Sequence, residues 1–80
     1  MIGLDYARDE VLRAFPNRAD VVGASNSVEV VVRGGLKASE LVFVESLLET
    51  EGYALERIYY HRNRDALVVR FKSLGVTSDV

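Results

Sequence analysis

Residues 55–72 read LERIYYHRNRDALVVRFK, two strand-like runs joined by the polar turn Arg62–Asp65. Pairing the runs across this turn places Arg57 opposite Arg70, and the alternation of side chains along a strand then sorts the residues onto two faces. A shift of one residue would mix apolar and charged residues on both faces, so we expect the first register. Its predicted core face collects five apolar or aromatic residues: Ile58, Tyr60, Leu67, Val69 and Phe71.

A first hairpin and two helices precede this stretch, which is therefore the second hairpin of the chain. The β-branched runs at 19–22 and 28–33 flank a short connection of small and polar residues, as in a hairpin. Apolar residues at helical spacing predict a helix over 5–15 with Asp5 as N-cap, and Pro16 ends it.

Residues 40–51 predict the other helix, with Ser39 as N-cap. Gly52 stands where a helix commonly ends in a left-handed residue. The order helix, hairpin, helix, hairpin predicts an α+β fold. We expect a two-layer sandwich in αββαββ order, whose four-stranded, mostly antiparallel sheet carries both helices on one face.

The size of the chain allows one domain, because 80 residues cannot bury two independent cores. We expect a single compact α+β domain over residues 1–76 and a flexible C-terminal tail over 77–80. The chain has no cysteine, which excludes disulfides and thiolate metal sites. Its apolar runs are far shorter than the roughly 20 residues of a membrane span, so we expect a soluble, cytoplasmic protein without membrane association.

The net charge of −2 hides an uneven distribution. Residues 1–51 hold nine acidic residues against five basic ones, whereas residues 52–72 hold two against five. The basic charge therefore lies on the second hairpin, on the sheet face opposite its predicted core. Nothing in the predicted fold covers that face, and its mixture of apolar and basic side chains is typical of an interface. The candidate interface residues are Val31, Arg33, Leu55, Arg57, Tyr59, His61, Val68, Arg70 and Lys72.

The predicted opposition of Arg57 and Arg70 requires a neutralising anion, because like charges directly across a strand pair destabilise the sheet. Three sources are open. The first is Glu29 or Glu56 of the same chain, and the second is an acidic surface of another subunit, such as the glutamates of residues 40–51. The third is a nucleic-acid phosphate.

No sequence motif indicates an enzyme, a metal or a cofactor. His61 is the only histidine, and no Ser/His/Asp set or metal-ligand spacing can be placed around it. The segment Arg33–Lys37 joins a strand to a helix, as phosphate-binding loops do, but it has neither the P-loop nor the dinucleotide-binding motif. We expect a plain turn there and no catalytic residue in the chain.

The stretch LLETEGY, Leu47–Tyr53, followed by a strand that ends in His61, resembles part of the HicA-type toxins, small RNA-cleaving domains with a double-stranded-RNA-binding-like fold. The resemblance implies RNA cleavage with His61 as the catalytic residue. Tyr59 and Tyr60 stand where that family has a small residue and a serine, and the third strand and closing helix of the family are missing from the pattern.

Two functions of different classes follow from these observations. The first is a small non-enzymatic interaction module that forms a homodimer or binds a protein partner through the uncovered sheet face. The second is single-stranded RNA binding on the same face, with Tyr59 stacking on a base. Its phosphate contacts would be Arg57, Arg62, Arg64, Arg70 and Lys72. A HicA-like RNA-cleaving toxin is the third hypothesis.

Overall fold

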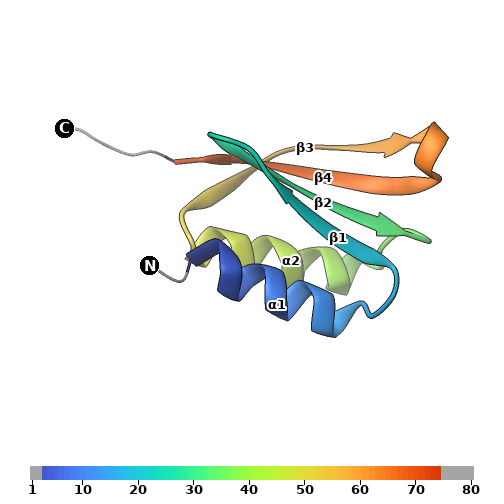
Figure 1. Ribbon diagram of the computed structural model, residues 1–80, viewed down its shortest axis with the longest axis horizontal. Helices are drawn as coiled ribbons and strands as arrows, with labels where there is room; N and C mark the ends of the chain where they lie inside the picture. The colour runs from blue at the N-terminus through green and yellow to red at the C-terminus, as the bar shows by residue number, and fades with distance from the viewer. Residues whose placement is uncertain (1–2, 75–80) are drawn as a thin grey trace.

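The computed structural model describes residues 3–74 and confirms the predicted fold, a four-stranded antiparallel sheet with two helices in αββαββ order. Figure 1 shows both helices beneath one face of the sheet, which we call the helix face, and the opposite side is the outer face. The predicted tail and the remaining ends of the predicted domain, 1–2 and 75–76, lie outside the described residues. The strands lie in the order β1-β2-β4-β3, where β1 is Ala19–Gly23, β2 is Ser27–Arg33, β3 is Tyr53–His61 and β4 is Ala66–Ser73.

The first helix, α1, spans Gly3–Ala14 and begins before the predicted N-cap. Asp5 therefore lies in the first turn, where its negative charge favours the positive end of the helix dipole. After the helix, the ring of Phe15 meets the ring of Phe43 from α2 in a T-shaped contact, with the ring centroids 6.3 Å apart. This contact joins the two helices beneath the sheet.

The second helix, α2, spans Ala38–Thr50, with Lys37 as N-cap. The prediction of Ser39 as N-cap is therefore wrong. Glu40 gives the reason, because its carboxylate accepts the backbone N–H of Lys37 at 2.8 Å and so caps the helix from within the first turn.

The predicted stop of α2 at Gly52 is confirmed. This residue has a φ of +90°, and its N–H donates to the carbonyl of Glu49 at 3.0 Å. The chain turns here directly into β3, and Tyr53 packs half-buried against the main core, which includes Leu48.

The register of the second hairpin is also as predicted. His61 pairs with Ala66 and Arg57 lies opposite Arg70, across a turn formed by the short 3-10 helix η1, Arg62–Arg64. At the centre of the sheet, β2 and β4 pair antiparallel. Because directly paired residues share a face, one row of four side chains points to the helices: Val21, Val30, Val69 and Ile58.

One residue of β3 interrupts the alternation. A β-bulge between Leu55 and Arg57 leaves Glu56 without a partner on β4, so Leu55 pairs with Phe71 and packs against the main core. The prediction of Leu55 on the outer face is therefore wrong, because the alternation was counted across the extra residue of the bulge.

The core lies between the helices and the first three strands of the sheet order. Val30, Val69 and Phe71 are completely buried there. The predicted core residues Ile58 and Tyr60 of β3 are instead 39% and 58% exposed. Figure 1 shows the reason: β3 starts beside the end of α2 and then rises away from it, and the tip of the hairpin extends beyond both helices.

We predict that Gly52→Ala lowers the free energy of unfolding by about 1–2 kcal/mol, because a residue with a Cβ is strained in a left-handed conformation. An added Cβ would meet no atom within 4 Å, so the strain lies in the backbone alone. Urea denaturation measures the change, and Gly52→Asn is the matched control, because asparagine tolerates this conformation better. Equal stability of the alanine variant and the wild type would contradict the prediction.

Candidate interaction surface

The centre of the outer face is a second, small core. Val31, Val68 and Ala66 are 6%, 1% and 1% exposed, although no described helix covers this side of the sheet. Tyr59 packs over them from β3. The expectation that Val31 and Val68 are open to a partner is therefore wrong, because they are buried beneath Tyr59 of the same face.

Hydrogen bonds hold this cover in place. The hydroxyl of Tyr59 donates to Glu29 at 3.2 Å, and the guanidinium of Arg70 donates to Glu29 and to Glu56, each at 3.1 Å. The bond to Glu56, together with the charges of both carboxylates, raises the pKa of Arg70 above its ordinary value. The anions predicted beside Arg70 thus belong to the same chain.

Arg57 contacts an aromatic ring instead of a carboxylate. Its guanidinium lies over the ring of Tyr59, 5.1 Å from the centroid, in a cation–π contact. One side of this ring is thereby covered and its hydroxyl is engaged with Glu29. Tyr59 is consequently less free to stack on a base than the sequence suggested.

The remaining candidate residues lie at the two ends of the outer face. Arg33 and His61 flank Ala66 in one row, and Lys72 pairs with Ser27 at the opposite end. The structure therefore brings together Tyr59, Arg57 and Arg70, and it separates Lys72 from Arg33 and His61. The Nδ1 atom of His61 is shut off from solvent and makes no hydrogen bond within the described chain.

A shallow hollow of about 310 Å³ opens at the end of the outer face near η1. Arg33 and Arg64 stand at this hollow with Asp20. Arg33 donates to the backbone carbonyl of Asn17, whereas Arg64 forms no ion pair within residues 3–74. The hollow therefore combines one free guanidinium with a carboxylate.

Exposed apolar side chains also lie along β3, which forms one edge of the sheet. Ile58 and Tyr60 lie on its helix face, because they pair with Val69 and Leu67, and they are nevertheless exposed. The hydroxyl of Tyr60 donates to the carboxylate of Asp65 in the turn, and this bond raises the pKa of Tyr60 above the ordinary 10.0. The tyrosine is therefore protonated at neutral pH and held in one orientation while exposed.

Sequence reasoning missed Ile58 and Tyr60 because it placed them in the core. The lengths of α2 and β3 could have indicated that these residues are exposed. A helix of 13 residues spans about 20 Å, whereas a strand of nine residues spans about 30 Å. Such a helix cannot cover the whole strand that follows it.

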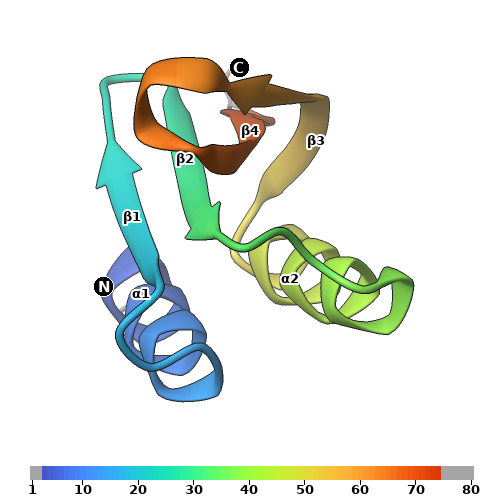
Figure 2. The same cartoon turned by 90° about the vertical axis from the view of Figure 1, so that its right-hand side faces the viewer.

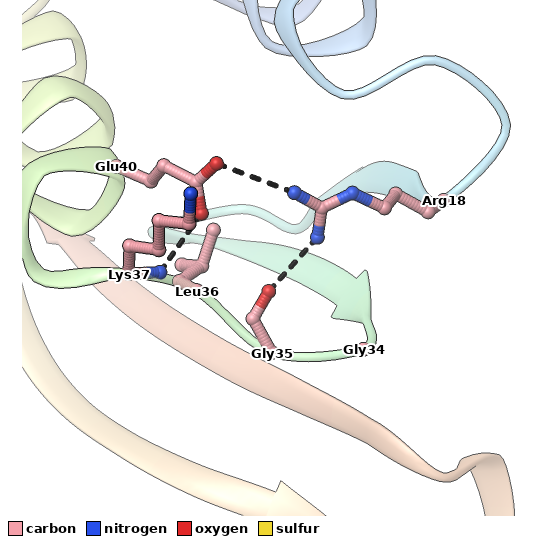
Figure 3. Close-up of a pocket in the computed structure, with 6 residues that line it drawn as sticks. All are labelled: Arg18, Gly34, Gly35, Leu36, Lys37 and Glu40. Atoms are coloured by element: carbon pink, nitrogen blue, oxygen red, sulfur yellow. Dashed lines mark hydrogen bonds and ion pairs between the residues drawn. The ribbon is translucent and has the colours of Figure 1, made fainter.

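The loop between β2 and α2 borders a larger hollow, of about 560 Å³. Figure 3 shows that its polar groups bind one another: Arg18 donates to Gly35 at 2.9 Å and to Glu40 at 3.4 Å. The carboxylate of Glu40 thus occupies the helix N-terminus, where a phosphate would otherwise bind. These contacts are those of the plain strand-to-helix turn that the sequence predicts.

Within the part of the chain that the structure describes, no group of three or more acidic or histidine side chains could hold a metal ion. None of the helices there is long and apolar enough to cross a membrane. No protein-family model matches the chain, and no curated protein is significantly similar to it. The function is therefore inferred from the residues and geometry of this chain.

We predict that Val68→Ala lowers the free energy of unfolding by about 1–2 kcal/mol, because it removes buried methyl groups from the small outer core. Val22→Ala is the matched control, since Val22 lies on the same face but is 45% exposed. Its effect should stay within about 0.5 kcal/mol. Thermal or urea unfolding measures both, and a neutral Val68→Ala would show that the outer core does not stabilise the monomer.

Proposed function

We propose that the protein is a non-enzymatic interaction module that binds a protein partner along β3. The observation that carries the proposal is the exposure of Ile58 and Tyr60 beside an edge strand whose outer side has no neighbouring strand in the described sheet. An extended segment added to such an edge gains backbone hydrogen bonds, and its side chains gain apolar contacts.

The surface keeps part of the predicted interface and extends it to the other side of the sheet. From the outer face it retains Arg57, Tyr59 and His61, and from the helix face it adds Ile58 and Tyr60. Tyrosine and arginine are the residues that most often dominate binding energy at protein interfaces. Asp65 fixes the orientation of Tyr60, so less conformational entropy is lost when a partner binds.

His61 has no catalytic role in the proposed function. Its Nδ1 atom lies inside the fold, and no described carboxylate or hydroxyl group is bonded to it as in a nucleophile–base pair. The αββαββ order also differs from the arrangement implied by the HicA resemblance, which requires a third strand in sequence and a closing helix.

Single-stranded RNA binding on the outer face is the second candidate function. It is favoured by the free guanidinium of Arg64 beside the hollow near η1. It is disfavoured by the engagement of Arg70 with two carboxylates and by the cover of Arg57 on the ring of Tyr59.

Fluorescence anisotropy with mixed-sequence RNA tests the second candidate. Binding that weakens steeply with salt and is reduced by Arg64→Ala would support it. The expected result under the first proposal is no binding at low salt.

A selection of displayed extended peptides against the immobilised protein tests the first proposal. We predict that the selected peptides lose about tenfold or more in affinity for Ile58→Asp and Tyr60→Asp, because each substitution places a charge in an apolar contact. Val22→Asp on the opposite edge strand is the matched control and should bind them as the wild type does.

Circular dichroism establishes that the variants are folded. If the peptides bind the two β3 variants as tightly as the wild type, the binding surface is not β3 and the proposal fails.

A further inference from the structure

We propose that the partner on β3 is a second copy of this chain, and that the two β3 strands pair antiparallel about a two-fold axis. This inference rests on the proposed function, because it names the occupant of the same edge. Pairing of this kind would join two four-stranded sheets into one and close the assembly as a dimer.

The two edges of the sheet differ in their readiness to pair. On β1, the N–H of Val21 already donates to the side chain of Asp20 at 2.9 Å, and the strand has only five residues. On β3, which has nine residues and a bulge at Glu56, no side chain of residues 3–74 is hydrogen-bonded to a backbone group. Side-chain capping protects an edge from pairing, so β3 is the edge left available.

The charges at the two ends of β3 favour a second copy of the chain as the partner and an antiparallel direction for its strand. Arg62 and Arg64 follow β3 in η1, whereas Glu49 and Glu51 precede it at the end of α2, whose last turn has no basic residue. Figure 2, with Figure 1, shows η1 and the end of α2 at opposite ends of β3. None of these four side chains has an ion-pair partner among the described residues.

An antiparallel pair brings η1 of each copy toward the end of α2 of the other. Basic residues then approach acidic residues and the negative end of the helix dipole at both ends of the contact. A parallel pair would instead bring η1 to η1 and α2 to α2, with like charges at each end. With the axis near Arg57, the middle residue of β3, the same antiparallel pairing places the exposed Ile58 of each copy beside the axis and Tyr60 toward the start of the other β3.

A charge-swap experiment on the full chain tests the inference. Light scattering and analytical ultracentrifugation should show that the wild type dimerises. Arg62→Glu/Arg64→Glu in one variant, and Glu49→Lys/Glu51→Lys in another, should each weaken the homodimer by about tenfold or more, because each places like charges at both ends. An equal mixture of the two variants should restore a dimer, since both ends are then complementary.

Arg13→Glu is the control, because Arg13 lies on α1 with a highly exposed side chain and its reversal changes the net charge without touching β3. It should leave dimer affinity unchanged. Failure of the mixture to restore the dimer would overturn the antiparallel arrangement.

A wild type that stays monomeric at several hundred micromolar would overturn the second copy as partner. The peptide selection would then decide the proposed function separately, through the effect of Ile58→Asp. A dimer that persists in Ile58→Asp and Tyr60→Asp would place the contact between copies elsewhere and overturn this inference, while the peptide selection still decides the proposed function. A monomer that binds RNA through Arg64 would overturn this inference in favour of the nucleic-acid function.

Discussion

The pairing of β2 with β4 is the contact on which the rest of this structure depends, because it joins the two αββ units at the centre of the sheet. It places Val30 opposite Val69, both without any exposed surface. A slip of one residue would turn one of these valines away from the helices. It would also separate Glu29 from Arg70, which are paired in the same register and joined by an ion pair.

The outer face shows how a small sheet protects its open side without a third layer. The two opposed arginines of the second hairpin repel each other in isolation. In the complete sheet, Glu29 of β2 and Glu56 of the bulge receive Arg70, while Arg57 turns onto Tyr59. Tyr59 in turn packs over Val31 and Val68. The charged side chains that suggested a binding site therefore serve largely to cover the outer face of the sheet.

The helices cover the sheet only in part, and the end of β3 is therefore exposed. Because α2 is shorter than β3 and the sheet twists away from it, the helix buries the start of the strand and exposes its end. Ile58 and Tyr60 are core residues by their pattern and surface residues by their position. A partner that covers them would complete the helix face of the sheet in the way that a third helix would.

Much of the fold was predictable from local patterns. The α+β order, the turn at Arg62–Asp65, the hairpin register and the stop at Gly52 follow from alternation, turn residues and the conformational freedom of glycine, all of which act over a few residues. The candidate site was less predictable. The alternation of β3 correctly placed Arg57, Tyr59 and His61, but it misplaced Leu55 and gave no account of burial.

The sequence by itself determined which residues alternate, where the chain turns and that the positive charge gathers on the second hairpin. Only the tertiary structure decided which carboxylates meet Arg70, that a bulge at Glu56 turns Leu55 inward, and that Ile58 lies beyond the reach of α2. The physical reason is that alternation is a property of one strand. Burial and ion pairing depend instead on which distant elements the strand order brings to it.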